Sequence, residues 1–328
     1  MKKIRSLKSH SPTACTNTRI NPFSSPSSIW SLEISEIGSN AAFNCCSVAF
    51  TSKVKSFFGY LFLAFFLALL GLYHYLQNMY GGYANFGYAL YGMRMFFILL
   101  VPMVTMRLMA EEKRQRTDQM LFTSPVSISG VVFAKYLAVL SMFAIVMIIS
   151  CIYPFVMTKY GQVNLKQAYM EILIFFLLGA AYMAIGLFIS ALTESQAFAA
   201  VITFVVVLVT SISSGIGGII PSDSKTGWLF FALLFLIFCL ITYLIMNQAT
   251  ISFMIGILGE IVLVVLYFIK PGIFEGAVQN FFDCFYILGR FDNIVYGILD
   301  VSDLIYYISI SGLFVFLTIQ GVKKRRWS

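Results

Sequence analysis

Long hydrophobic runs separated by short polar interruptions dominate the pattern of residues along this chain. Eight of these runs approach the length of about 20 residues that a helix needs to cross the hydrocarbon core of a bilayer. The predicted spans are 57–76, 91–106, 131–153, 169–192, 197–220, 228–246, 251–269 and 304–319. The runs are continuous and do not alternate in short segments, which excludes a membrane β-barrel. The pattern therefore predicts an all-α polytopic membrane protein with about eight transmembrane helices, or six to seven if 228–269 re-enters.

Composition and charge place this chain in the membrane and orient it. Hydrophobic residues make up 59% of the chain and charged residues 11%, which excludes a soluble enzyme. The net charge of +8 comes from basic clusters near the N-terminus, between the second and third spans, and at 323–326. Basic flanks of membrane spans lie in the cytoplasm. We therefore expect a multi-pass protein of the plasma (inner) membrane with both termini cytoplasmic, and no nucleic-acid partner.

Two regions depart from the regular pattern of spans. Residues 1–51 are rich in Ser, Asn and Thr and show no helical period, so we expect a disordered or non-conforming N-terminal extension. Residues 52–328 form the predicted membrane domain. Within it, 270–303 mixes aromatic and charged residues too irregularly for a span and predicts amphipathic helices on the outer surface.

The densest charge between spans lies in residues 107–124, which we name the elbow segment. Glu111 is spaced to pair with Arg114, and Glu112 with Arg116, so a short surface helix is expected. Its ends carry apolar residues that could anchor it to a partner: Leu108, Met109, Met120, Leu121 and Phe122. Ser124 and Pro125 read as an N-cap and a first helical position that start the next span. Apolar anchors with a charged rim suit a helix that docks in a groove of a cytoplasmic partner.

Other candidate chemistry is sparse. The nearest sequence to a P-loop, residues 218–226, lacks the glycine before its lysine and the strand–loop–helix context. Six cysteines without a CxxC pair and two histidines offer no metal site, disulfide framework or hydrolase triad. The chain is therefore not expected to be an enzyme or to hold a cofactor.

Charged and small residues inside the spans are the remaining signals. Glu260 lies near the middle of a span, beside Gly256 and Gly259, which would admit a neighbouring helix. Arg94, Lys135 and Glu171 lie near span ends, where the long basic side chains can reach the interface. The fourth span carries small residues at spacings that favour close helix packing: Gly179, Ala180, Ala184, Gly186 and Ser190.

Three stretches in order resemble type-2 ABC transporter permeases, in the branch that includes gliding-motility-type permeases. They are M-R-L-M-A-E-E-K-R-Q-R-T-D-Q-M-L-F-T-S-P-V at 106–126, G-L-F-I-S-A-L-T-E-S-Q at 186–196 and G-I-L-D-V-S-D-L-I-Y-Y at 297–307. The resemblance implies an export permease that pairs with a second permease copy or paralogue. It also implies two separate ATP-binding subunits, which would carry the ATP and magnesium.

The same resemblance assigns residues to the contact with these ATP-binding subunits. Residues 111–122 would be the coupling helix, and the residues implied in coupling are Arg107, Glu111, Glu112, Arg114, Arg116, Thr117, Leu121, Phe122, Pro125 and Lys135. A smaller second contact would involve Glu194, Ser195 and Gln196. Two other functions stay open: an ion-coupled secondary carrier that uses Glu260, and a non-transporting membrane scaffold of a surface machine.

Overall fold

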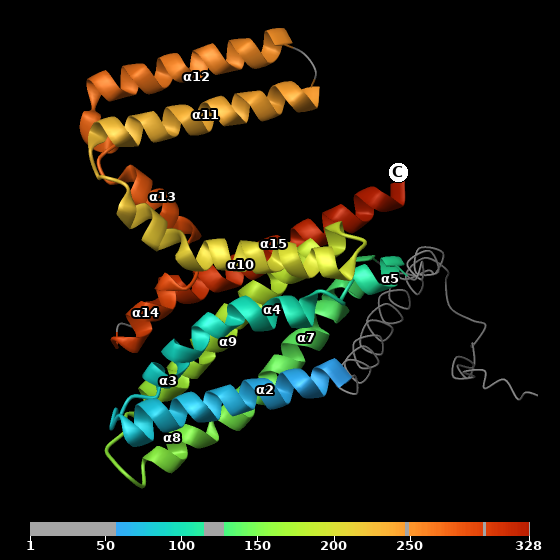
Figure 1. Cartoon of the computed structure of the whole chain (residues 1–328), viewed down its shortest axis with the longest axis vertical. Helices are drawn as coiled ribbons and strands as arrows, with labels where there is room; N and C mark the ends of the chain where they lie inside the picture. The colour runs from blue at the N-terminus through green and yellow to red at the C-terminus, as the bar shows by residue number, and fades with distance from the viewer. Residues whose placement is uncertain (1–56, 115–127, 247–248, 298–299, 328) are drawn as a thin grey trace, which may run out of the picture. The chain divides into compact units, whose positions relative to one another are not determined.

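Helices form all of the regular secondary structure in the described part of the chain. The computed structural model describes residues 57–114, 128–246, 249–297 and 300–327. The N-terminal extension and residues 115–127, which include Ser124 and Pro125, lie outside these ranges. The described helices have these bounds: α2 Phe57–His74, η1 Tyr75–Tyr80, α3 Gly87–Met93, η2 Arg94–Phe96, α4 Phe97–Thr105, α5 Ala110–Arg114, α7 Ile128–Ser150, α8 Ile152–Met157, α9 Leu165–Leu192, α10 Gln196–Ile219, α11 Ser224–Met246, α12 Ala249–Ile269, η3 Pro271–Ile273, α13 Ala277–Phe285, α14 Gly289–Val295 and α15 Val301–Trp327 (Figure 1).

Six helical stretches among the described residues are long and apolar enough to cross a membrane. They are Gly59–Tyr80, Gly87–Arg114, Ile128–Met157, Leu165–Leu192, Gln196–Ile219 and Val301–Lys324. This confirms the predicted all-α polytopic membrane protein. Helices α11 and α12 pack on each other and contain shorter apolar stretches, Ser224–Leu240 and Gly256–Ile269. The count of eight spans therefore stays a prediction.

Proline explains where the helix of the third span breaks. Helix α7 ends at Ser150, and α8 begins at Ile152 with Pro154 inside it. The ring of a proline clashes with the carbonyl four residues earlier, which here belongs to Ser150. The span thus continues to Met157, past the proline, with a change of helix at Cys151.

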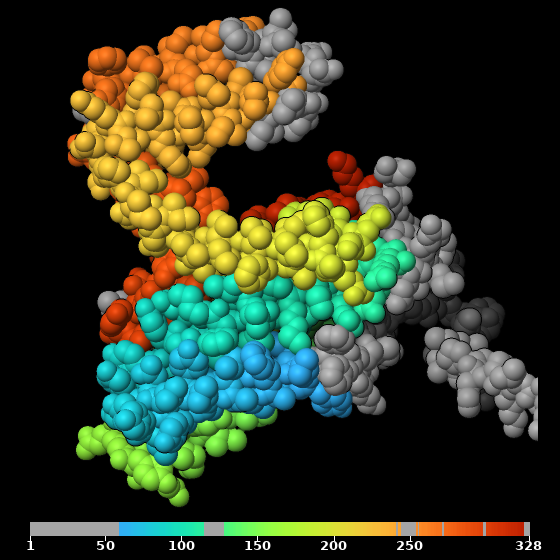
Figure 2. All heavy atoms as spheres, in the orientation of Figure 1, coloured from blue at the N-terminus to red at the C-terminus, as the bar shows by residue number. Residues whose placement is uncertain are grey.

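Helix α9 lies at the centre of the packing. It contacts α3, α4, α7, α10, α14 and α15. Phe66, Phe97, Phe143 and Phe175 are all buried and form an aromatic cluster around it, with ring centroids 5.4 Å apart for Phe66 and Phe143 and 5.0 Å apart for Phe97 and Phe175. Lipid is as apolar as these side chains, so the association of the helices depends on such close packing. Figure 2 shows one face of the molecule, where side chains of α2, α4 and α10 cover the surface.

The small residues of α9 allow the close helix contacts that their spacing predicts. A Cβ atom on Gly179 would lie 2.3 Å from the Phe143 ring, and one on Gly186 would lie 2.3 Å from Thr105 Oγ1. Both distances are far below van der Waals contact. The two glycines therefore set how closely α7 and α4 approach α9.

We expect Gly186→Ala to destabilise the protein and Gly312→Ala to leave it unchanged or slightly more stable. Alanine is favoured over glycine in a helix by about 1 kcal/mol, so the helix itself gains in both variants. At Gly312 nothing lies within 4 Å, whereas at Gly186 the side chain of Thr105 must move. Thermal unfolding of the detergent-purified variants measures the difference, and equal midpoints would contradict the packing described above.

The mixed segment that follows α12 forms short helices, as its pattern predicts. Helix α13 packs on α10, where Ser213 Oγ donates a 2.6 Å hydrogen bond to the Phe282 carbonyl. Helix α14 packs on α3 and α9. The last helix, α15, continues through the basic residues that were expected to form a tail, to Trp327.

Candidate functional site

The described part of the elbow segment lies against the end of α9 and the start of α7. After α4 ends at Thr105, the chain turns and forms α5, whose first turn carries Glu111 and Glu112 and whose last turn carries Lys113 and Arg114. Acidic residues at the start of a helix and basic residues at its end both complement the helix dipole. A short surface helix is therefore present where the charge pattern predicts it.

Ser190 of α9 fixes the turn that leads into α5. Its hydroxyl oxygen accepts hydrogen bonds from the backbone amides of Met109 at 3.1 Å and Ala110 at 3.2 Å. The hydroxyl also lies 3.4 Å from the Met106 carbonyl, to which it donates. These amides stand at the start of a helix, where the first N–H groups have no partner within the helix. Ser190 thus supplies, from another helix, the cap that α5 lacks in its own sequence.

Two lysines attach the same segment to its neighbours. Lys135 of α7 forms an ion pair with Glu112 and donates a 3.3 Å hydrogen bond to the Leu108 carbonyl. Lys113 donates to the carbonyl of Ala191, at the end of α9. The elbow segment is consequently held at three places: by Ser190, by Ala191 and by Lys135.

The structure locates only some of the residues predicted to couple this chain to a partner. Arg107, Glu111 and Glu112 are partly exposed and Arg114 is exposed. Lys135 is mostly covered, with 11% of its side chain exposed. The other predicted coupling residues lie outside the described residues: Arg116, Thr117, Leu121, Phe122 and Pro125.

One part of the elbow prediction is wrong. Leu108 and Met109 were expected to be anchors for a partner, but they are buried in this chain's own core, with 2% and 6% of their surface exposed. Since Ser190 and Lys135 hold this turn against α9 and α7, both side chains point into the protein. Any apolar anchor for a partner must come from elsewhere in the segment.

The predicted second contact lies beside the first. Glu194 and Ser195 are exposed in the turn between α9 and α10, and Gln196 begins α10. Helix α5 contacts both α9 and α10. The two segments predicted to contact a partner therefore lie next to each other.

Glu260 lies away from these two segments, on α12. A Cβ atom on Gly256 would lie 2.8 Å from Cys239 Sγ, and one on Gly259 would lie 2.1 Å from the Phe235 ring. The expected close approach of a helix at these glycines is confirmed, and the neighbour is α11. Glu260 is half-buried beside a cavity of about 280 Å³ that Phe235 and Cys239 also line.

Buried charges near α14 were not identified from the sequence as a cluster. Arg94, expected to reach the interface, is 4% exposed and forms an ion pair with Asp292 of α14. Its guanidinium also lies 3.7 Å from the centroid of the Tyr91 ring. Burial raises the pKa of Asp292, and the Arg94 charge opposes this rise. An isolated charge between apolar runs was the only signal in the sequence, and it does not identify a partner.

Glu171 lies near the start of α9, as the sequence predicts, and its side chain is buried. It is 0% exposed, and its Oε1 accepts a 3.0 Å hydrogen bond from Gln167 Nε2. A Cβ atom on Gly87, at the start of α3, would lie 2.8 Å from its carboxyl carbon, so a larger residue there would displace the Glu171 carboxyl group. In the described ranges, no group of three His, Cys, Asp or Glu side chains is arranged to hold a metal ion.

We expect Ser190→Ala to loosen the elbow segment selectively. The change leaves two buried amides without their acceptor, which costs about 1–3 kcal/mol. Hydrogen exchange of the backbone amides of residues 106–114 should become faster, while exchange of the amides of α9 stays unchanged. Ser309→Ala is the matched control, because the exposed Ser309 hydroxyl bonds only the carbonyl of Tyr306 in its own helix. Unchanged protection of 106–114 in Ser190→Ala would contradict the capping role.

Comparison with known proteins matches this chain to a family of transporters. The family model described as ABC-2 family transporter protein matches residues 72–270. The match includes the described elbow segment, Ser190 and the 194–196 turn, and it ends before α13, α14 and α15. No curated protein and no solved structure matches the chain.

Proposed function

Because this chain belongs to the ABC-2 transporter family, we propose that it is the permease subunit of an ATP-driven exporter and is coupled to its motor through the elbow segment. Family membership makes it the membrane component of an ABC transporter, which associates with ATP-binding subunits. The finer assignments are our proposal: export as the direction, two ATP-binding subunits and a second permease copy or paralogue. We further propose an inner-membrane location with cytoplasmic termini and, from the sequence resemblance, the gliding-motility-type branch.

The attachment of the elbow segment at three places carries this proposal. Ser190, Ala191 and Lys135 tie residues 106–113 to α9 and α7. A flexible loop would absorb a displacement imposed by a partner, whereas a segment held in this way transmits the displacement to both helices. Closure of the ATP-binding subunits would then tilt α7 and α9 and open a path along the permease.

The exposed charges of α5 and the adjacent turn supply the contact surface in this proposal. Glu111, Arg114 and Glu194 lie at its rim, and the predicted residues 116–125 would complete it. ATP and magnesium would bind to the partner subunits. The ATP-binding subunits would use the free energy of hydrolysis, and this chain would supply the moving helices.

Charge reversal on the contact surface tests the proposal without knowledge of the cargo. We expect the double variant Glu111→Lys, Arg114→Glu to retain far less of the ATP-binding subunits during purification than the unaltered permease does. Lys159→Glu is the control, because Lys159 is exposed at the other end of α7 and α8. Equal retention in the double variant and the control would refute the proposed contact.

A separate variant tests the carrier alternative. An ion-coupled carrier that uses Glu260 would lose transport in Glu260→Gln, whereas an ATP-driven permease would keep it. The half-buried position of Glu260 beside α11 is compatible with a packing role.

A further inference from the structure

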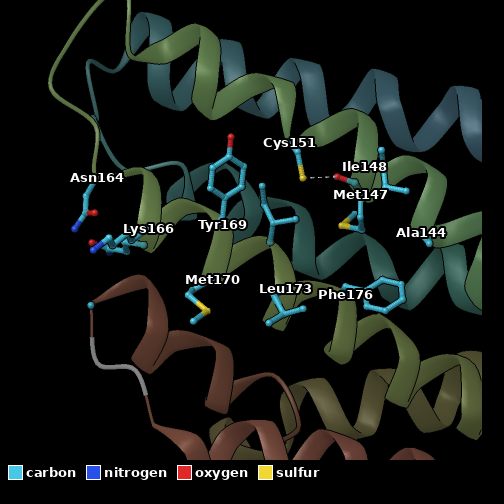
Figure 3. A pocket seen from close by; sticks show the side chains of 13 residues that line it. Ala144, Met147, Ile148, Cys151, Asn164, Lys166, Tyr169, Met170, Leu173 and Phe176 are labelled. Atoms are coloured by element: carbon cyan, nitrogen blue, oxygen red, sulfur yellow. Dashed lines mark hydrogen bonds between the residues drawn. The ribbon is translucent and has the colours of Figure 1, made fainter.

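A groove of about 950 Å³ lies between the second half of α7 and the first half of α9, away from the elbow segment, and Gly297 also lines it. Its walls are apolar and include Met147, Ile148, Met170, Leu173 and Phe176. Figure 3 shows these side chains along the groove, with Asn164 and Lys166 together at one end. The groove thus has apolar walls along its length and polar side chains at one end, which we call its mouth.

The length of the groove corresponds to one leaflet of a bilayer. Lys166 and Phe176 both lie on α9, and at ~1.5 Å per residue they are about 15 Å apart along its axis. Half of the ~30 Å hydrocarbon core of a membrane has the same thickness. A groove that begins at the interface and ends near the bilayer centre has the dimensions of one lipid acyl chain.

The charge at the mouth selects the headgroup. Lys166 is exposed at the start of α9, and no acidic side chain is among the described residues that line the groove. The N-terminus of α9 adds partial positive charge, and the side chain of its N-cap residue, Asn164, makes no capping hydrogen bond. A cation and amide donors without an acidic partner favour a phosphate with net negative charge over a zwitterionic headgroup.

We propose that this groove binds one anionic phospholipid, with its phosphate at Lys166 and an acyl chain along Met170, Leu173 and Phe176. The lipid is a resident of the leaflet at the N-terminal end of α9. This site lies outside the coupling surface and does not depend on the proposed function. It requires only that the helices span a bilayer.

Photolabelling in proteoliposomes tests this site. The full-length protein is reconstituted in phosphatidylcholine with a trace of phosphatidylglycerol that carries a diazirine on its acyl chain. After illumination, mass spectrometry should locate the adducts mainly in residues 144–176. A matched diazirine phosphatidylcholine should label these residues several-fold less. Labelling spread evenly over all lipid-facing helices would overturn the proposal and indicate ordinary annular lipid.

Two pairs of variants separate the headgroup contact from the acyl groove. Lys166→Glu should lower phosphatidylglycerol labelling by roughly fivefold or more, since one basic residue near an anionic surface contributes about that factor. Lys159→Glu, an exposed position that does not line the groove, should not lower it. Leu173→Trp should lower labelling by narrowing the groove along the path of the acyl chain, whereas Leu99→Trp, at an exposed leucine of α4, should not. Full labelling in Lys166→Glu or in Leu173→Trp would refute the site.

Discussion

Replacing Glu112 with lysine is expected to uncouple the permease from its ATP-binding subunits while the protein still folds and enters the membrane. The change removes the ion pair with Lys135 and puts two positive charges together. Glu112 is 40% exposed, and a partly exposed pair contributes only about 1 kcal/mol to stability. The ion pair that joins α5 to α7 is lost, however, while the hydrogen bond from Lys135 to the Leu108 carbonyl stays, so much less of the motion of α5 reaches α7.

A distance measurement reports this effect without a known cargo. Spin labels at Thr158 and Asp223, both exposed and distant in sequence from α5, should change their separation when ATP and vanadate bind to the assembled wild-type complex. In Glu112→Lys this change should be largely lost. A full change in the variant would contradict the coupling role.

The charge-swapped double variant shows how Glu112 acts. If Glu112 works through Lys135, then Glu112→Lys combined with Lys135→Glu restores the pair and the distance change. If the double variant stays uncoupled and also loses the ATP-binding subunits, Glu112 contacts them directly. Lys225→Glu serves as the control for a change of surface charge, because Lys225 is exposed on α11.

The second large effect is expected at Arg94. Arg94→Leu leaves Asp292 without its partner. Loss of one member of a buried pair costs about 3–5 kcal/mol, and we expect the lower end of this range because the Asp292 side chain is 25% exposed. Removing both charges in Arg94→Leu, Asp292→Leu should recover most of this loss, because no uncompensated charge remains. Lys225→Leu is the control, since it also removes one positive charge but at an exposed position of α11. Thermal unfolding of the purified variants compares them.

The loss in Arg94→Leu should depend on pH. Burial raises the pKa of Asp292, and Arg94 now opposes that rise. Without Arg94 the pKa rises further, so the folded state binds a proton more readily than the unfolded state does. Stability then falls as pH rises above the unfolded pKa. We therefore expect the stability of Arg94→Leu to be closer to that of the wild type at about pH 5 than at about pH 8. An equal loss of stability at both pH values would indicate that the Asp292 carboxyl group is solvated and would contradict this account.

The sequence predicts the helices well because each helix depends on the apolar run of its own segment. An apolar run of sufficient length must satisfy its backbone hydrogen bonds internally, so it forms a helix whatever its neighbours are. The small residues at 179, 186, 256 and 259 were predicted in the same way, since only close packing favours them inside a span. Each of these predictions needs information from one segment alone.

Contacts between distant segments could not be predicted in this way. A serine in an apolar run reads as a small packing residue, and nothing near Ser190 shows that it caps a turn at residues 109 and 110. The pairing of Arg94 with Asp292 joins positions 198 apart. From the sequence, Leu108 and Met109 are expected to be exposed anchors. They are buried because Ser190 of α9 and Lys135 of α7 hold the turn that carries them against the protein.

Cross-linking to the ATP-binding subunit tests the central claim most directly. In a cysteine-free background, a cysteine at Glu111 and a cysteine at Thr158 mark the two ends of the helices. A short bifunctional reagent should join the cysteine at 111 to the ATP-binding subunit and leave the cysteine at 158 unlinked. Linkage from 158, with none from 111, would contradict the claim that this permease is driven through its elbow segment.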